Sequence, residues 1–104
     1  MDFEWDLAKN ERNLQKHGFD FADAAECFSH PLLVREDTRQ DYAERRWIAL
    51  GRIQDTIVNC VFTRRRTRIR MISLRRANRR EREIYHKFLH QAQSHGLDPD
   101  SPDD

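Results

Sequence analysis

Residues 63–85 read TRRRTRIRMISLRRANRREREIY, and the predicted fold depends most on this stretch. It opens with a basic turn and continues as a strand at 67–74, where apolar and basic side chains alternate as in a half-buried strand. A second basic pair follows, and then a helix that begins at Ala77 or Asn78, of which asparagine is the better N-cap. The stretch therefore predicts a strand–helix unit at the end of the domain.

Arginine is the dominant residue of this stretch. From Arg64 to Arg82 there are ten arginines, no lysine and a single acid, Glu81. A guanidinium group is planar, permanently charged and able to bind phosphate through two hydrogen bonds at once, whereas a solvated face normally mixes Arg with Lys and with acids. The composition favours a phosphate-binding surface. The alternative is a soluble surface whose arginines pair with the chain's own carboxylates.

The length and charge of the chain limit its organisation. Its 104 residues are enough for one domain with one core. The formal net charge is +1, but residues 98–104 carry four aspartates, and without them 19 basic residues face 14 acidic ones. We therefore expect a single domain at 1–97, a disordered acidic tail at 98–104 and a polyanionic partner.

The two cysteines, Cys27 and Cys60, lie in apolar contexts and far apart in the sequence. The chain shows no secretory leader and no apolar run long enough to span a membrane. We expect a cytoplasmic protein in which both thiols are reduced and buried as small hydrophobic groups. A disulfide between them is the alternative.

The remaining pattern predicts an α+β domain. We expect two N-terminal helices, an antiparallel sheet of three to four strands and a C-terminal helix, with the helices on one face of the sheet and the other face open to a ligand. The expected segments are a short edge strand at 1–5, helices at 7–17 and 21–29, strands at 32–34, 45–50, 56–63 and 67–74, a turn at 51–55, and a last helix that ends at Gly96.

Two further groups of residues could carry chemistry. Lys16 and His17 end the first expected helix, where the helix dipole favours the charged imidazole, and His17 is either a helix cap or an acid–base catalyst. Glu44 precedes Arg45 and Arg46, and is either a general base held by ion pairs or an ordinary surface acid.

A metal or a cofactor is not expected. His86 and His90 form an i, i+4 pair on the last expected helix, but no cysteine or nearby acid completes a metal site with them. The chain also lacks a glycine-rich phosphate loop, a nucleophile elbow and a CxxC pair.

A series of short motifs runs through the chain in order from Phe3 to about Tyr85. They are FEWD at 3–6, Asn13, KHG at 16–18, Phe21, AA at 24–25, Phe28, Pro31, ER at 44–45, LG at 50–51, RIRMISLR at 68–75, Ala77, ER at 81–82 and Tyr85. Together these motifs resemble the BrnT family of type II toxins. Two positions depart from the family pattern: the turn at 64–66 reads Arg-Arg-Arg where the family usually has Glu-Arg-Gly, and Leu74 replaces a usual alanine.

The resemblance implies a RelE/ParE-like fold and a metal-independent endoribonuclease that cleaves RNA and inhibits translation. It also implies neutralisation by a BrnA-like antitoxin, which binds operator DNA so that the complex represses its own transcription. The residues themselves leave two alternatives open. One is a non-catalytic nucleic-acid-binding module, and the other is a protein-interaction module whose arginines dock an acidic partner.

RNA supplies its own nucleophile, the 2′-hydroxyl, so a protein can cleave it by aligning this oxygen, removing its proton and stabilising the charged phosphate. Arg70 and Arg75 are the candidates for stabilising the phosphate. Lys16 or His17 could act as base or acid, and Arg45 could position the backbone. The convergence of these residues is implied by the resemblance alone. The arginines expected to contact flanking phosphates of the RNA are Arg65, Arg68, Arg76, Arg79 and Arg80.

Overall fold

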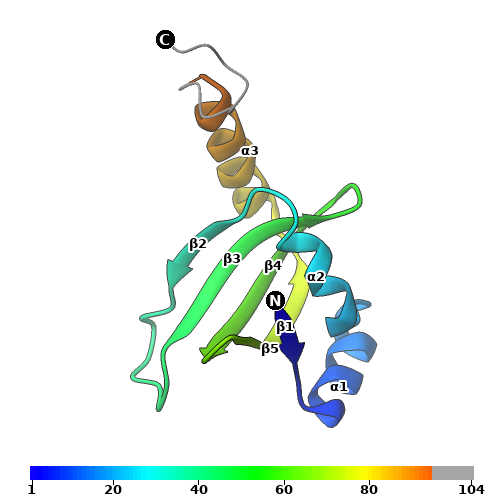
Figure 1. Cartoon of the computed structure of the whole chain (residues 1–104). Helices are drawn as coiled ribbons and strands as arrows, with labels where there is room; N and C mark the ends of the chain where they lie inside the picture. Colours follow the sequence, from blue (N-terminus) through cyan, green and yellow to red (C-terminus); the bar gives the residue numbers. More distant parts are fainter. Residues whose placement is uncertain (95–104) are drawn as a thin grey trace.

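The computed structural model describes residues 1–94, in which a five-stranded sheet lies between an N-terminal pair of helices and a C-terminal helix (Figure 1). None of the described helices is long and apolar enough to cross a membrane. The expected helix end at Gly96 and the expected acidic tail lie outside the described residues. The elements are β1 (Asp2–Glu4), α1 (Leu7–His17), the 3-10 turn η1 (Phe21–Asp23), α2 (Ala24–Cys27), β2 (Leu33–Glu36), β3 (Arg46–Ile53), β4 (Thr56–Arg65), β5 (Arg68–Arg76) and α3 (Arg79–Ser94).

The sheet is mixed, with the strand order β1-β5-β4-β3-β2. Neighbouring strands from β2 to β5 are antiparallel, whereas β1 runs parallel to β5 and pairs Phe3 with Ile69. The prediction of an antiparallel sheet of three to four strands was therefore wrong. β1 has only three residues, too few for a periodic pattern, and its partner strand lies at the other end of the chain. Whether β1 runs parallel or antiparallel to β5 depends on the path of the chain between them, and the residues of β1 alone do not indicate it.

The first helix has the predicted bounds, whereas the second is much shorter than predicted. Asp6 caps α1 by accepting a hydrogen bond from the N–H of Lys9, and Gly18 ends it with φ 78°. The helix expected at 21–29 is instead a 3-10 turn followed by the four residues of α2. The N–H of Ser29 bonds the carbonyl of Glu26, an i→i−3 contact that tightens and ends the helix.

One face of the sheet, here called the core face, carries the main hydrophobic core. η1 and α2 cover this face and bury Phe21 and Cys27 against the strands. Gly51 lies in β3 beneath α2, where a Cβ atom would approach Cys27 Cβ to 3.2 Å and Leu32 Cδ1 to 2.8 Å. This glycine was expected to open a turn at 51–55, but its role is to let α2 approach the strand closely.

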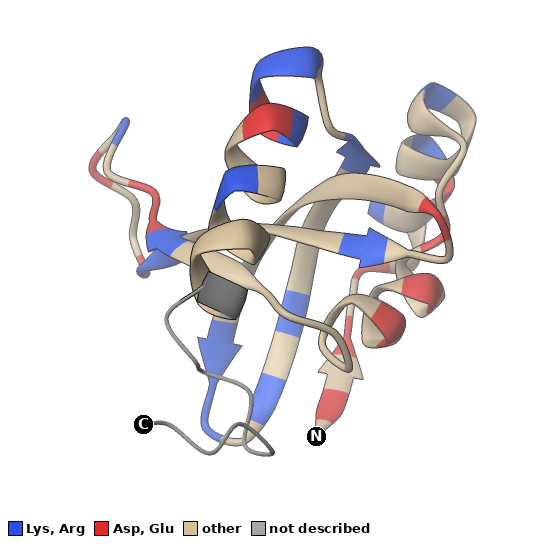
Figure 2. Ribbon diagram, turned by 90° about the horizontal axis from the view of Figure 1, so that it is seen from above, with Lys and Arg blue, Asp and Glu red and all other residues tan. Residues whose placement is uncertain are grey.

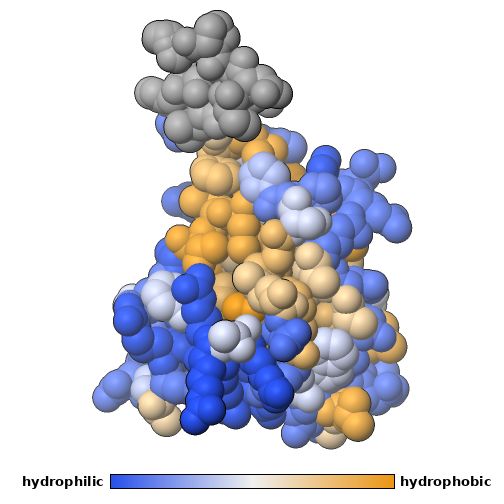
Figure 3. Space-filling model, viewed as in Figure 1, coloured by the Kyte–Doolittle hydropathy of each residue, from blue (hydrophilic) through white to orange (hydrophobic). Residues whose placement is uncertain are grey.

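The opposite face of the sheet, here called the α3 face, is covered only in part. Tyr85 of α3 packs with Leu50 and Ile57, and its hydroxyl donates a 2.6 Å hydrogen bond to the carbonyl of Pro31. The expectation that all helices share one face was therefore wrong. α3 covers the end of the face near Ile57, and basic residues lie along the strands (Figure 2). The other end, with the β4–β5 hairpin, is strongly hydrophilic (Figures 1 and 3).

Both tight hairpins contain a residue in the left-handed region. Gln54 has φ 51° between β3 and β4, and Arg66 has φ 59° between β4 and β5. Two-residue hairpin turns favour positive φ because their twist then matches that of the strands. Arg66 therefore holds a conformation that glycine adopts more easily.

The prediction of buried, unpaired cysteines is confirmed, because Cys27 and Cys60 are both free and fully buried. Burial raises the pKa of Cys27 to about 12 and also raises the pKa of Cys60. Both therefore remain neutral thiols and serve as core side chains. Cys60 lies 3.9 Å from the sulfur of Met71.

Candidate functional site

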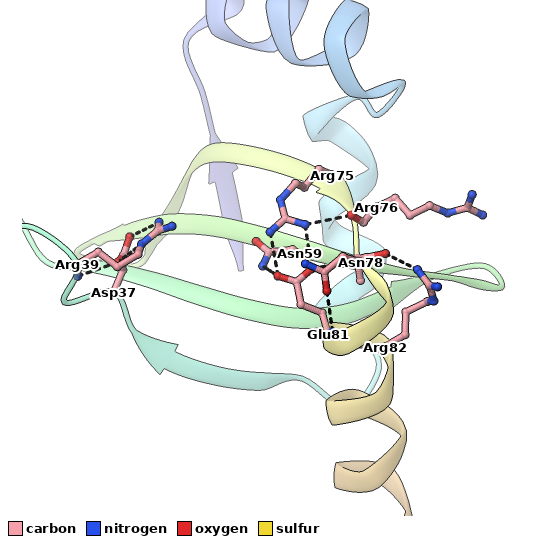
Figure 4. A network of polar contacts seen from close by, with 9 residues as sticks. Asp37, Arg39, Asn59, Arg75, Arg76, Asn78, Glu81 and Arg82 are labelled. Atoms are coloured by element: carbon pink, nitrogen blue, oxygen red, sulfur yellow. Dashed lines mark hydrogen bonds and ion pairs between the residues drawn. The ribbon is translucent and has the colours of Figure 1, made fainter.

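The junction between β5 and α3 contains a polar network centred on Glu81 (Figure 4). Arg75 donates two hydrogen bonds of 2.8 Å to the two carboxylate oxygens of Glu81, and Asn59 Nδ2 donates another of 2.9 Å. The N–H of Asn78 bonds Glu81 Oε1, and Asn78 Oδ1 accepts from the N–H of Glu81, each at 2.8 Å. This reciprocal pair is a capping box, so the residues that start α3 also hold Arg75.

Glu81 acts as an anchor for Arg75. Its pKa is lowered, first by the hydrogen bonds from Arg75, and its carboxylate accepts four hydrogen bonds in all. A carboxylate that is satisfied in this way is a poor proton acceptor, so the network favours a structural role for it. The side chain of Arg75 keeps 36% of its surface exposed and can still meet a ligand.

The predicted pair Lys16–His17 lies close enough to Arg75 for their charges to interact. Asn13, one turn before His17, donates a 2.8 Å hydrogen bond to the carbonyl of Leu74 and accepts a 3.1 Å bond from its N–H. These bonds attach the last turn of α1 to β5 beside Arg75. The pKa of His17 is lowered by burial, then by the charges of Lys16 and Arg75.

The pKa of His17 differs from the expectation. The dipole of α1 was expected to favour the charged imidazole, but desolvation and two nearby cations outweigh it. The ring of His17 is therefore neutral near pH 7 and able to accept a proton. Lys16 is exposed at the same helix end.

A second group of charges lies at the other end of β5, around Glu4. Arg70 donates to Glu4 at 3.0 Å, Arg68 at 3.4 Å, and Arg65 approaches it to 3.9 Å. Arg65 also donates to Glu44 at 2.8 Å. Several of the predicted phosphate-binding arginines are thus paired with the protein's own acids, and Glu44 belongs to a surface ion pair that lowers its pKa.

The predicted residues Arg70 and Arg75 share the α3 face but lie apart. A bulge in β5 between Met71 and Ser73 lets both side chains point to this face. Their partners on β4, Thr63 and Asn59, are four residues apart, which corresponds to about 13 Å at roughly 3.3 Å per residue. Glu4 holds Arg70 and Glu81 holds Arg75 at opposite ends of this stretch, so in the observed arrangement their guanidinium groups do not converge on one phosphate. The two arginines can bind one RNA strand only at different phosphates.

Arg45 is directed away from these residues. It pairs with Glu36 at 3.0 Å and stacks over Trp47 at 5.0 Å, and Trp47 packs against the core of the opposite face. Arg46 instead lies opposite Thr63 on the α3 face. The structure therefore brings Arg46, and not Arg45, to the face that carries Arg70.

The other predicted arginines lie at the ends of β5 and α3. Arg79 is 86% exposed along its side chain and pairs only loosely with Glu83, at 3.6 Å. Arg76 and Arg80 are exposed, and within residues 1–94 neither has a carboxylate partner. All three side chains are accessible to a ligand, but Arg76 pairs with Val58 and points away from Arg75 (Figure 4).

Four residues of the two networks were not predicted from the sequence as part of the site. Asn78 and Glu81 have the spacing of a capping box, so their contact was visible in the sequence. Asn59 is a polar residue within the apolar strand β4, which is itself a signal of a buried hydrogen bond. Glu4 could not be found in this way, because the residues next to it in the sequence do not indicate that it pairs with Arg68 and Arg70.

The described residues contain no cluster suited to a metal. Within residues 1–94, no three His, Cys, Asp or Glu side chains are grouped so that they could hold an ion. His86 lies on the exposed side of α3.

Comparison with known families identifies the class to which this chain belongs. A model of the ribonuclease toxin BrnT of type II toxin–antitoxin systems matches residues 5–81, a range that includes Arg70, Arg75 and Glu81. No curated protein matches the chain. The protein is thus a ribonuclease toxin of a type II toxin–antitoxin system, with RNA as substrate and an antitoxin protein as partner. The chain belongs to the BrnT family.

Proposed function

We propose that this toxin inhibits translation as a metal-independent endoribonuclease, in which the 2′-hydroxyl of RNA attacks the adjacent phosphate. The observation that carries the proposal is the guanidinium of Arg75, held by two hydrogen bonds to Glu81 next to the neutral ring of His17. A fixed cation beside a proton acceptor supplies the two things that this reaction needs from a protein.

Arg75 is the proposed electrostatic catalyst. Negative charge grows on the phosphate oxygens as the 2′-oxygen attacks, and a preorganised guanidinium stabilises that charge without having to reorient. Glu81 provides the preorganisation, because it fixes the plane of the fork while part of Arg75 remains exposed. A cation that rotates freely would lose part of this advantage.

His17 is the proposed general base. It removes the proton of the 2′-hydroxyl as the oxygen attacks, and the lowered pKa keeps the ring in its accepting form at neutral pH. The exposed ammonium group of Lys16 next to it is the proposed proton donor to the leaving 5′-oxygen. The products are then a 2′,3′-cyclic phosphate and a free 5′-hydroxyl, with no water consumed in this step.

The remaining arginines are proposed to contact the RNA backbone on either side of the cleaved bond. Those beyond Arg75 are Arg76, Arg79 and Arg80, and those at the far end of β5 are Arg65, Arg68 and Arg70. Each phosphate contact adds affinity that falls as salt concentration rises. A BrnA-like antitoxin is proposed to neutralise the toxin by covering this face, and to bind operator DNA in the complex.

The test compares Arg75→Ala with Lys87→Ala, which removes one positive charge from an exposed position on α3. Purified proteins are incubated with RNA in the presence of a chelator, and folding is checked by circular dichroism. We expect Arg75→Ala to lower the cleavage rate about 100-fold or more, in line with loss of a preorganised donor, and Lys87→Ala to cleave at the wild-type rate.

Three outcomes contradict the proposal in different ways. Equal rates for the two variants would remove Arg75 from the mechanism. Cleavage that stops on addition of the chelator would exclude the metal-independent route. Binding of RNA that stays intact with the wild-type protein would favour a non-catalytic nucleic-acid-binding module.

A further inference from the structure

The buried hydroxyl of Thr63 lacks a hydrogen-bond partner. Thr63 is 2% exposed, and among residues 1–94 its Oγ1 is the one buried side-chain polar atom without a partner. Burying a hydroxyl without a hydrogen bond costs folding free energy, so such groups are rare in native proteins. The unpaired hydroxyl of Thr63 can therefore form a hydrogen bond with a ligand.

Thr63 lies in a row of polar residues across the α3 face. In the sheet register Arg46 of β3 is opposite Thr63 of β4, Thr63 is opposite Arg70 of β5, and Arg70 is beside Glu4 of β1. Residues that are directly paired across strands point to the same face, so the side chains of Arg46 and Arg70 leave the sheet on either side of Thr63. Arg70 keeps 31% of its side chain exposed.

The surroundings of Thr63 carry an excess of positive charge. The pKa of Glu44 is lowered first by its hydrogen bond from Arg65, and the charges of Arg70 and Arg46 lower it as well, so these groups lie close together. Within residues 1–94 Arg46 has no carboxylate partner and instead lies 4.2 Å above the ring of Tyr42. Four guanidinium groups, those of Arg46, Arg65, Arg68 and Arg70, thus share two directly paired carboxylates, Glu4 and Glu44, and the charge of Asp6 acts on Arg70 at longer range.

We infer that Arg46, Thr63 and Arg70 form a second binding site for a phosphate group of the RNA backbone, separate from Arg75. A phosphate oxygen accepts hydrogen bonds only, which suits a hydroxyl donor between two guanidinium forks. Arg46 is held by a stacking contact and not by an ion pair, so it can turn toward the phosphate and uncover Thr63. The incoming oxygen then receives the hydrogen bond that Thr63 lacks in the free protein.

The separation of the two sites predicts a dependence on RNA length. This inference rests on the proposed function, because it assigns the second site to the same RNA strand. Arg70 and Arg75 are about 13 Å apart along the sheet, or about four nucleotides at roughly 3.4 Å per stacked nucleotide. A dinucleotide at Arg75 cannot reach Thr63, whereas a strand of ten nucleotides can.

The experiment measures binding of 2′-O-methyl RNA, which lacks the nucleophile and cannot be cleaved. Thr63→Val preserves shape and removes the hydroxyl, Arg46→Gln removes one phosphate contact, and Lys87→Ala is the control. For a decanucleotide we expect Thr63→Val to weaken binding about three- to tenfold. Arg46→Gln should weaken it about tenfold and reduce the salt slope by about one. For a dinucleotide we expect wild-type binding by both variants.

The outcomes separate this inference from the proposed function. Wild-type affinity of Thr63→Val for the decanucleotide would overturn the second site. An equal loss for the dinucleotide would also overturn it, since it would show a general structural effect. Because the ligand is uncleavable, these results do not depend on catalysis. Absence of cleavage in the Arg75 experiment would contradict the proposed function even if the binding pattern held.

Discussion

The side chain of Asn13 on α1 forms a two-way hydrogen-bond pair with the backbone of Leu74 on β5, donating to its carbonyl at 2.8 Å and accepting from its N–H at 3.1 Å. The same amide also donates to the carbonyl of Phe19 at 3.0 Å. β1 pairs with only the first part of β5, so Asn13 satisfies the edge of the strand beyond it. One buried side chain thus joins the start of the chain to the strand that carries Arg75.

Replacing Asn13 by alanine tests this connection. The change removes all three hydrogen bonds and leaves backbone groups of Leu74 buried without partners, so we expect the free energy of unfolding to fall by about 2–3 kcal/mol. The measurement is urea denaturation followed by circular dichroism. Gln15→Ala is the matched control on the exposed side of α1, where we expect a change within about 0.5 kcal/mol. Similar losses in both variants would contradict the role of Asn13.

Replacing Glu81 by glutamine tests whether the anchor of Arg75 matters for catalysis. The variant keeps the shape of the side chain but loses its charge, so Arg75 is held less firmly and we expect cleavage to slow about tenfold. We also expect the free energy of unfolding to fall by about 1–2 kcal/mol, because charge-assisted hydrogen bonds are lost. Glu83→Gln, which is mostly exposed on the same helix, is the control and should behave as wild type. Unchanged cleavage by Glu81→Gln would show that Arg75 needs no anchor.

The pH dependence of cleavage tests the role of His17. Its pKa lies below the usual value of 6.5, so the imidazole becomes protonated, and can no longer act as a base, only in more acidic solution. We expect the single-turnover rate to fall on the acid side with a midpoint below 6.5, and His17→Gln to remove this limb of the profile. NMR titration of the imidazole gives its pKa directly. A measured pKa above 6.5 would contradict the assignment.

The lowered pKa of His17 also predicts how the free energy of unfolding changes with pH. At pH values between the lowered pKa of His17 in the folded protein and its usual pKa in the unfolded chain, the unfolded state binds more protons than the folded state. The free energy of unfolding should therefore rise with pH through this window and level off above about 6.5. His17→Gln should remove that increment, which denaturation curves at several pH values would show.

A single substitution in the turn between β4 and β5 should stabilise the folded protein. Arg66 has φ 59°, which disfavours any side chain with a Cβ atom, whereas glycine adopts it without strain. We expect Arg66→Gly to raise the free energy of unfolding by up to about 1 kcal/mol, after the entropy cost of an added glycine. Thr67→Gly, at the neighbouring position without positive φ, should lower it, and thermal denaturation can compare the two. Destabilisation by Arg66→Gly would contradict the strain argument.

Much of the local structure was predictable because its causes are local. α1 begins and ends where Asp6 and Gly18 place its caps, and the strand expected at 67–74 is observed as Arg68–Arg76. The capping pair that opens α3 was also available from spacing alone. These features depend on contacts between residues a few positions apart, which a sequence records directly.

Local patterns in the sequence are enough to predict the arginine-rich strand and the helix after it, together with the local excess of positive charge that favours a polyanionic partner. Folding of the whole chain is needed to place β1 parallel to β5, to pair Glu4 with Arg70, and to bring Arg46 but not Arg45 to the face of Arg70. It also decided that the ring of His17 is neutral, since burial and the charge of Arg75 reach it through space. Contacts between distant segments depend on the path of the whole chain, and a shift of one residue along a strand moves a side chain to the other face.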